Sequence, residues 1–503
     1  MSLTSSDPRR WKALAFISMA QLMVTLDSTI VNIALPSAQA DLGISDGNRQ
    51  WVVTAYALAF GGLLLFGGRI ADLWGRKKAF IVGLVGFAAA SALGGLAGNQ
   101  VLLLSSRAAQ GAFGALLAPA ALSLLSVMFT ESKERAKAFG VFGAITGGGG
   151  AVGLLLGGAL TEWLNWRWTF FVNIPFAVVA ALGAWFVIRE PERRSERYPL
   201  DIPGVVLSTL GLVALVYGFS SAESHGWADT VTIGSLAGSV ALLILFCLVE
   251  SKVKMPMLPL RVVTERNRGG VYLSLALAIV GLFGIFLFVT YFLQVVQGYS
   301  AIRTGFAFMP MVIAFIVGST QIGTRLMTRV RPRLLMAPGF ALSAVAMLLL
   351  TRLEVDTAYT AVVFPAMLLL GLGMGTAFMA AMSLTTHGVR PQDAGIASAM
   401  ANTSQQVGGA VGTALLNTIA ASATATYLAS HRAAEPGAEA ALRARALVDG
   451  YTQAIWWAVA IETGAALVAW FLINAGRPGE ASGDMNADGT AGSAKADLSV
   501  VLH

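Results

Sequence analysis

Fourteen apolar stretches of about 20 residues, separated by short charged loops, constrain this chain more than any other feature. A helix of about 20 apolar residues crosses the hydrocarbon core of a bilayer. Only 12% of the 503 residues are charged, about half the roughly 25% of a typical soluble protein, which is too few to cover a soluble surface. The sequence therefore predicts an all-α polytopic membrane protein. It excludes a disordered chain, a nucleic-acid-binding domain and a secreted disulfide scaffold.

The distribution of Lys and Arg orients the predicted spans. The spans are 13–35, 51–71, 79–98, 101–127, 138–160, 168–188, 202–220, 230–250, 270–293, 304–325, 334–352, 360–383, 396–421 and 451–474. With the N-terminus in the cytoplasm, 26 of the 34 Lys and Arg residues lie on the cytoplasmic side, seven lie outside and one lies within a span. This excess follows the positive-inside rule and places both termini in the cytoplasm. Because Cys247 is the sole cysteine, no intramolecular disulfide and no metal site are predicted.

A short repeat relates the two halves of the chain. Gly-Gly-Ala-Val-Gly occurs at 149–153 and again at 408–412, which begins 259 residues later. A second similarity joins the basic loop after the second span to the basic loop after the tenth. The repeat predicts two parallel six-span halves with two inserted spans, an architecture that transporters use. The predicted parts are a cytoplasmic arm (1–12), a six-helix bundle (13–190), a two-helix insertion (191–268), a second six-helix bundle (269–475) and a disordered cytoplasmic tail (476–503).

Five motifs carry a family resemblance. They lie at 26–36, 68–78, 107–111, 166–175 and 291–305. Together they resemble the fourteen-span drug/proton antiporter family of the major facilitator superfamily. The resemblance implies the major facilitator fold and a transporter rather than an enzyme. Such a protein exports hydrophobic or amphiphilic drugs by alternating access between its two halves.

The same resemblance implies how the protein works in a cell. It implies a bacterial-type cytoplasmic membrane, a proton gradient as the energy source without a cofactor, and a protein that functions as a monomer. The expected partners are the lipid bilayer, protons and small hydrophobic or amphiphilic substrates, but no nucleic acid.

Asp27, Arg107 and Glu462 are the ionisable residues inside predicted spans. A charge there costs roughly 2.5–3.5 kcal/mol or more, so each is a candidate for proton or substrate coupling. Asp27 and Arg107 lie about 13 Å and about 9 Å from the outer ends of their spans at 1.5 Å per residue, which allows them to interact. The resemblance implies that Asp27 couples transport to a proton or to the substrate and that Arg107 takes part in proton transfer. The alternative is a structural ion pair that holds the first span to the fourth. Glu462 is interpreted either as a second proton- or cation-binding site or as a protonated, hydrogen-bonded bystander.

The loop between the second and third predicted spans holds a candidate cytoplasmic gate. Its residues are Gly68, Asp72, Gly75, Arg76 and Lys77. The glycines allow a tight turn between closely packed helices, and Asp72 is placed to pair with Arg76 or to lie at a helix N-terminus. The resemblance implies a latch that holds the cytoplasmic side closed. The alternative is that the basic residues only determine topology.

A glycine-rich stretch marks the fifth predicted span. Its candidate residues are Gly149, Gly150, Gly153, Gly157 and Gly158. Small residues at this density let two helices touch backbone to backbone, and the resemblance implies an antiporter motif at the interface of the halves. Leu154 stands where the family usually has proline, which removes the expected kink. A packing role and a role in antiport therefore both remain open.

Polar uncharged residues within spans are candidates for lining a central cavity, because amides that face lipid are expensive. They are Asn32, Gln110, Tyr291, Gln294, Asn402, Gln405 and Gln406.

Two other functions compete with drug efflux. One is an exporter or facilitator of a specific metabolite or lipid, which the leucine at the motif proline position keeps open. The more distant one is a non-transporting membrane receptor or an intramembrane enzyme. The sequence has no phosphate-binding glycine loop, no His-Glu-x-x-His and no Gly-x-Ser-x-Gly element. Without a nucleotide-binding domain, an ion gradient is the expected energy source.

Overall fold

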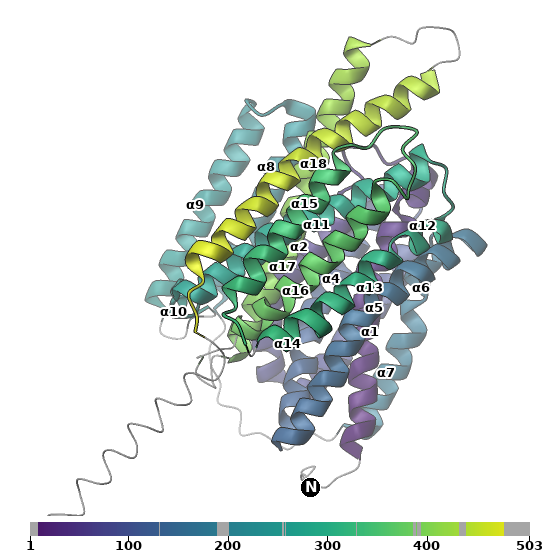
Figure 1. Ribbon diagram of the computed structural model, residues 1–503. Coiled ribbons are helices and arrows are strands. Elements are labelled where there is room, and N and C mark those ends of the chain that lie inside the picture. Colours follow the sequence, from purple (N-terminus) through teal and green to yellow (C-terminus); the bar gives the residue numbers. More distant parts are fainter. Residues whose placement is uncertain are drawn as a thin grey trace, which may run out of the picture.

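The computed structural model describes residues 9–129, 131–188, 201–253, 256, 258–327, 329–385, 389, 394–431 and 439–476, in which every regular element is helical. Twelve of these helices are long and apolar enough to cross a membrane. Two shorter apolar stretches, Trp51–Leu64 and Val152–Trp163, lie where the second and fifth spans are predicted. The all-helical class is therefore confirmed, and the helices run alongside one another (Figure 1).

The first bundle contains the N-terminal helices. They are α1 (Arg9–Leu42), α2 (Trp51–Trp74), α3 (Arg76–Gly95), α4 (Gln100–Met128), α5 (Ser132–Trp163), α6 (Trp168–Phe171) and α7 (Asn173–Val187). The backbones of α2 and α4 touch, because a Cβ on Gly67 would lie 2.1 Å from the carbonyl oxygen of Ala115. A Cβ on Gly111 would likewise lie 2.3 Å from the carbonyl oxygen of Tyr56. Glycine is therefore required at both positions.

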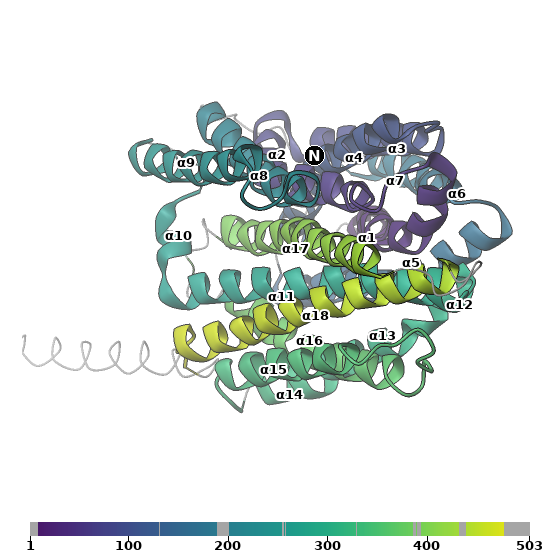
Figure 2. The ribbon, with the colours of Figure 1, turned by 90° about the horizontal axis from the view of Figure 1, so that it is seen from above.

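The inserted helices cover a seam between the two bundles. They are α8 (Ile202–His225) and α9 (Thr230–Lys252), followed by the short α10 (Leu260–Thr264). The α8 helix packs against both α2 and α17, and α9 packs on its outer side (Figure 2). Hydrogen bonds on both sides hold it, among them Gln50 Nε2 to Ser220 Oγ at 2.7 Å and Thr418 Oγ1 to the carbonyl oxygen of Phe219 at 3.0 Å.

The second bundle is less regular than its sequence suggests. Its helices are α11 (Arg266–Tyr291), η1 (Phe292–Val296), α12 (Ala301–Ala307), α13 (Met309–Val317), η2 (Gly318–Gly323), α14 (Thr324–Met327), α15 (Arg333–Leu350), α16 (Val363–Thr385), α17 (Ala394–Ser430) and α18 (Glu439–Leu472). The predicted span 304–325 is interrupted by the π-helical η2, which the hydropathy pattern does not reveal. The last two helices are longer than predicted and extend beyond the others at the top of Figure 1.

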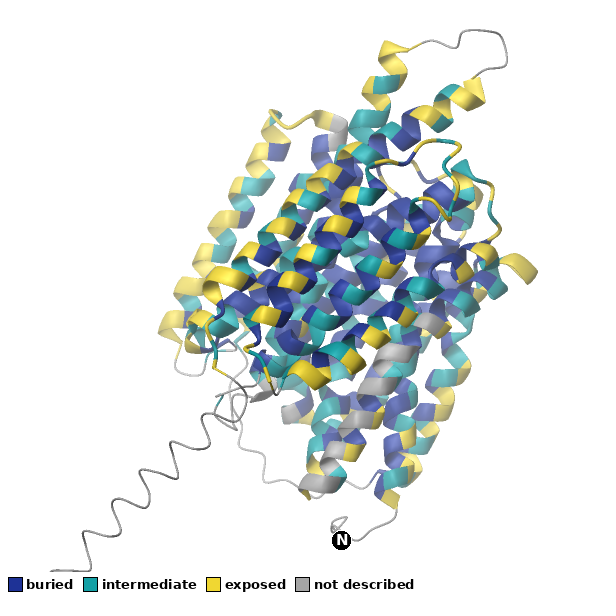
Figure 3. Ribbon diagram, in the orientation of Figure 1, coloured by how far each residue is buried: buried dark blue, intermediate teal, exposed yellow. Residues whose placement is uncertain are grey.

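The two bundles face each other across the molecule. Seen from above, α3, α4 and α7 lie on one side and α13, α15 and α16 on the other, with α1 and α17 between them (Figure 2). Buried residues lie mostly on the inward faces of the helices, whereas exposed residues lie on the outward faces (Figure 3). Many exposed side chains are large and apolar, including Phe186, Trp457 and Phe471. Such a surface suits contact with lipid.

The repeated pentapeptides occupy matching places. In the first bundle Gly153 lies against α1, where an added Cβ would lie 2.0 Å from Thr29 Oγ1. In the second bundle Gly412 lies against α11, where an added Cβ would lie 2.4 Å from the carbonyl oxygen of Val280. The repeat therefore performs the same task twice, bringing a long helix onto the first helix of its own bundle. This supports the parallel pseudo-repeat.

The position predicted for the glycine-rich stretch of α5 needs correction. Gly149, Gly150, Gly153 and Gly157 face α1 within the first bundle and not the interface of the halves. Only Gly158 of the five meets the other bundle, because its added Cβ would lie 2.6 Å from the Cα of Ile302 in α12. Hydropathy could not predict this, because a helix that is apolar all round gives no signal of which neighbour each face meets.

The boundaries of the predicted parts remain predictions. Arg9, Arg10 and Lys12 belong to α1, so this helix extends into the predicted arm. Residues 1–8, 189–200 and 477–503 lie outside the part of the chain that the structure describes, and they include most of the predicted tail.

Candidate functional site

Asp27 and Arg107 meet in the middle of the first bundle. Asp27 comes from α1 and Arg107 from α4, and Arg107 Nη1 lies 2.7 Å from Asp27 Oδ2. The Asp27 side chain is fully buried and that of Arg107 is 1% exposed. The similar depths inferred from the sequence thus correspond to a direct ion pair.

The second oxygen of Asp27 is held by two amides. Gln110 Nε2 donates to Asp27 Oδ1 at 2.9 Å, and Asn173 Nδ2 donates to the same oxygen at 2.8 Å. Both amides also contact the Ser91 hydroxyl of α3, Gln110 Nε2 at 2.7 Å and Asn173 Nδ2 at 3.3 Å. Three donors therefore stabilise the ionised form of one buried carboxylate, and four helices supply the residues of this network.

Arg107 makes further hydrogen bonds to residues around Asp27. Its Nε donates to the carbonyl oxygen of Val52 at 2.9 Å, and its Nη1 also donates to Gln110 Oε1 at 2.9 Å. The guanidinium carbon lies 4.4 Å from the ring centroid of Tyr56 on α2. A buried ion pair is tolerated when the remaining hydrogen-bonding positions are filled in this way. We call Asp27, Ser91, Arg107, Gln110 and Asn173 the Asp27 network.

The structure gives Asn173 a role that its sequence position did not reveal. Asn173 follows the break between α6 and α7, and it begins α7 with its side chain fully buried. The preceding residues fix that position, because Arg167 donates to Asp41 of α1 at 2.6 Å and Trp166 donates to the same oxygen at 3.0 Å. The motif at 166–175 thus anchors α6 and aims an amide at Asp27. The only sequence signal was the motif itself.

Arg49 joins the two bundles at the end of the molecule predicted to face outward. Its side chain is 2% exposed, although it lies in a loop where the sequence suggested an ordinary external cation. Arg49 Nε donates to Asn417 Oδ1 of α17 at 3.0 Å. Its guanidinium carbon lies 4.0 Å from the ring centroid of Tyr291 and 5.9 Å from that of Tyr451. Such stacking is favourable for a partly desolvated cation.

Further contacts close the same end. Gln294 Nε2 donates to the carbonyl oxygen of Ile33 at 3.0 Å, and the backbone N–H of Ile302 donates to Glu162 Oε2 at 3.0 Å. The close approach of Gly158 to α12 lies beside the second contact. We call this set, with Arg49, Tyr291 and Asn417, the outer closure. Of the predicted cavity residues, Tyr291 and Gln294 belong to it.

The remaining cavity candidates are dispersed. Gln110 is part of the Asp27 network, and Asn32 donates to the carbonyl oxygen of Ser28 in its own helix. On α17, Asn402 is exposed and Gln405 donates to its own helix. Gln406 packs on α2, where Gly61 leaves room for its Cβ. The structure thus does not bring the seven predicted residues together into one polar lining.

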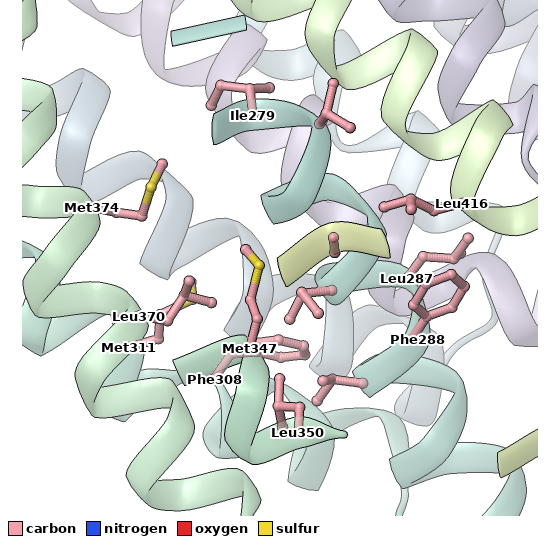
Figure 4. Close-up of a cluster of buried hydrophobic side chains, with 14 of the residues drawn as sticks. Ile279, Leu287, Phe288, Phe308, Met311, Met347, Leu350, Leu370, Met374 and Leu416 are labelled. Atoms are coloured by element: carbon pink, nitrogen blue, oxygen red, sulfur yellow. The ribbon is translucent and has the colours of Figure 1, made fainter. Parts of the chain in front are cut away.

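Glu462 lies apart from the Asp27 network, in the second bundle. It is fully buried, and neither carboxylate oxygen has a hydrogen-bond partner among the described residues. A Cβ added to Gly281 of α11 would lie 3.3 Å from Glu462 Oε2 and 2.8 Å from the terminal methyl of Met347. Met347 belongs to an apolar cluster with Phe308, Leu350 and others (Figure 4). Among the described residues, no group of three His, Cys, Asp or Glu could hold a metal ion.

The predicted cytoplasmic gate is seen in part. Gly75 adopts φ +98° between α2 and α3, a conformation that favours glycine. Lys77 Nζ donates to the carbonyl oxygen of Trp185 at the end of α7, at 2.7 Å. Gly68 is not tightly packed, since its added Cβ would make ordinary contact with Pro119. The side chain of Asp72 lies outside the described residues, so its predicted pairing with Arg76 stays a prediction.

Comparison with known proteins agrees with this architecture. The model of the Major Facilitator Superfamily matches residues 17–413. A puromycin resistance protein from Streptomyces alboniger is 51% identical over 470 residues, which cover 93% of this chain and 92% of that protein. A cephamycin export protein from Amycolatopsis lactamdurans is 38% identical over 433 residues, covering 85% of this chain and 89% of that protein.

A solved structure has the same fold. A bacterial homologue of the human lysosomal transporter Spinster, in an inward-facing and occupied conformation, superposes with a TM-score of 0.68. The match covers 93% of this chain and 97% of that one at 17% sequence identity.

Proposed function

As a member of the Major Facilitator Superfamily this chain is a multi-pass membrane transporter, and we propose that it exports hydrophobic or amphiphilic antibiotics in exchange for protons. The names of its relatives support the substrate class, since they confer resistance to puromycin or export cephamycin. We place it in the cytoplasmic membrane of a bacterial-type cell with both termini in the cytoplasm, because 26 of its 34 Lys and Arg then lie inside.

The Asp27 network is the observation that carries the coupling proposal. A carboxylate that exchanges a proton during a transport cycle needs partners that stabilise its ionised form, and Asp27 has three donors. Protonation of Asp27 removes the charge that Arg107 neutralises and weakens the pull on Gln110 and Asn173. Because these partners lie on separate helices, the change reaches α1, α4 and α7 together.

The outer closure supports alternating access as the mechanism. Arg49, Gln294 and Ile302 each bond across the two bundles at the predicted outer end. A bistable transporter needs such a contact set to break when the opposite side closes. We propose that a monomer performs the cycle, because both faces of the moving interface come from one chain. A proton gradient supplies the energy, and no cofactor takes part.

The decisive measurement is drug transport in proteoliposomes with an imposed proton gradient. Wild-type protein should accumulate puromycin when the gradient is present, and Asp27→Asn should abolish this accumulation while the protein remains folded. The Arg10→Gln variant is a suitable control, because Arg10 forms an ion pair with Glu134 at 2.6 Å in the same bundle outside the Asp27 network. Gradient-driven accumulation retained by Asp27→Asn would contradict the coupling role.

A narrower function is the second candidate. Leu154 replaces the proline typical of the resembling antiporters, and α5 continues without interruption through this position. A dedicated exporter of one compound would fit this departure, and a relative is named for cephamycin export. Competition of chemically unrelated compounds against puromycin transport distinguishes the two, because a dedicated exporter responds to only one chemical class.

A further inference from the structure

A groove lies at the end of the molecule predicted to face the cytoplasm, outside the Asp27 network and the outer closure. It has a volume of about 600 Å³ and runs between the ends of α2, α3 and α7. Its lining residues are Trp74, Lys77, Lys78, Ile81, Val82 and Trp185. Two indoles, two lysines and two aliphatic side chains thus share one surface depression.

The walls of the groove are fixed by local structure. Trp74 ends α2, and the left-handed turn at Gly75 starts α3 at once, which places Lys77 and Lys78 in its first turn. Lys77 Nζ donates to the carbonyl oxygen of Trp185 at 2.7 Å and lies 5.7 Å from the centroid of its ring. Lys77 thereby caps the last turn of α7 and holds Trp185 beside α3.

Three of the hydrophobic lining residues have exposed side chains. Trp74 is 58% exposed and Trp185 is 63% exposed, and Val82 is exposed farther along α3. Indole rings favour the level of the lipid headgroups, where one edge is wet and the other is apolar. Ile81 and Val82 lie farther along α3 than the two lysines. In the proposed orientation the groove would therefore cross the boundary between headgroups and acyl chains.

We propose that this groove binds an anionic phospholipid of the cytoplasmic leaflet. An acyl chain lies along Ile81 and Val82 between the two indoles, and the phosphate lies next to Lys77 and Lys78. Charge selects this occupant, because both ionisable groups among the described lining residues are lysines and the cytoplasmic leaflet is negatively charged. The proposal rests on the orientation given under the proposed function, but it does not depend on which drug is transported.

A bound lipid at this place would stabilise a particular part of the fold. The phosphate would lie at the turn between α2 and α3, which the sequence predicts as part of the cytoplasmic gate. The acyl chain would lie between α3 and α7, and α7 begins with Asn173 of the Asp27 network. The lipid would thus contact two helices that contribute to the proposed proton site.

Competition between two lipids tests the proposal without a transport assay. Purified full-length protein is mixed with equal amounts of dioleoyl phosphatidylglycerol and dioleoyl phosphatidylcholine, and the retained lipids are counted by native mass spectrometry. Wild type should retain phosphatidylglycerol preferentially. Lys78→Gln should lower that preference about fivefold, the expected effect of one lysine near an anionic surface. The control Lys252→Gln, an exposed lysine at the end of α9, should change nothing.

A second measurement locates the lipid. Phosphatidylglycerol with brominated acyl chains should quench tryptophan fluorescence more than brominated phosphatidylcholine. This difference should shrink in Trp185→Phe, which leaves Trp74 as the other indole of the groove, but keep its wild-type size in Trp457→Phe. Trp457 is exposed on α18 and is not a lining residue of the groove. Equal retention of the two lipids by wild type would overturn the proposal. An equal loss of preference in Lys78→Gln and Lys252→Gln would also overturn it.

Discussion

Among the described residues, each six-helix bundle buries one carboxyl group, and the two groups have opposite surroundings. Asp27 of the first bundle accepts hydrogen bonds from Arg107, Gln110 and Asn173. Glu462 of the second bundle is equally buried, but it has no partner among the described residues and lies next to Met347 and Gly281. Similar burial therefore gives two different chemical environments.

The difference concerns the ionised form. Transfer of a charge into apolar surroundings is very expensive unless partners compensate it. Asp27 has a cation and two amides within hydrogen-bond distance, so a charge on its carboxylate is compensated. Glu462 lacks such partners among the described residues, so its apolar surroundings favour the neutral acid. We infer that proton coupling belongs to the first bundle and that Glu462 is a packing residue of the second.

Removal of the cation from the first bundle should have the largest effect. Arg107→Met keeps much of the side-chain volume but leaves Asp27 buried without its counter-charge. Breaking a buried pair in this way costs about 3–5 kcal/mol. Thermal unfolding in detergent should therefore shift strongly to lower temperature, and gradient-driven transport should be lost.

The double variant Asp27→Asn/Arg107→Met shows how much of the lost stability comes from the unpaired Asp27 charge and how much from the lost contacts of Arg107. If the uncompensated Asp27 charge causes the damage, the double variant should be more stable than Arg107→Met while transport remains absent. Arg10→Met is the matched control, because it removes a guanidinium from another ion pair of the same bundle, whose partner Glu134 keeps contact with water at 25% exposure and is therefore less costly to leave alone than the fully buried Asp27. A double variant no more stable than Arg107→Met would contradict this explanation.

A medium effect is expected from the amide that the sequence did not identify. Asn173→Ala removes one donor from Asp27 Oδ1 and leaves Arg107 and Gln110 in place. Loss of one buried hydrogen bond to a charged group costs about 1.5–3 kcal/mol. We expect transport to fall severalfold and its pH profile to move, because the balance between the two forms of Asp27 changes.

A buried serine in the other bundle controls for the general cost of a lost hydrogen bond. Ser274→Ala removes a fully buried hydroxyl of α11 that donates only within its own helix, to the carbonyl oxygen of Val271. It should lower stability slightly without moving the pH profile. An unchanged pH profile in Asn173→Ala would exclude Asn173 from the proton site.

These residues also indicate how far sequence reasoning reaches. The ion pair of Asp27 and Arg107 could be anticipated, because charges within spans are rare and their depths follow from helical rise. Asn173 could not, because its contact with Asp27 depends on the break after α6 and on the rotation of α7. Hydropathy fixes where a helix crosses the membrane, but a helix that is apolar all round does not reveal its rotation.

The same physical limit explains two other differences. The glycines of α5 pack on α1 within their own bundle, since small residues mark a close contact without naming the partner. The sequence predicts Arg49 as an ordinary cation in an external loop, yet it is buried between the bundles. Its partners Tyr291 and Asn417 come from distant parts of the chain, so local sequence does not reveal the contact. Long-range packing determined both outcomes.

The smallest effect should come from the carboxyl of the second bundle. Glu462→Gln is the same chemical change as Asp27→Asn, a carboxyl replaced by an amide of nearly equal shape, so each variant is the matched control of the other. If Glu462 stays neutral throughout the cycle, the amide replaces it without loss of a charge, and gradient-driven transport and its pH profile should remain at the wild-type level. The free energy of unfolding should change by no more than about 1 kcal/mol, because the substitution removes no hydrogen bond to a described residue. Transport abolished by Glu462→Gln would place a second proton or cation site in the second bundle and remove the distinction between the two carboxyl groups.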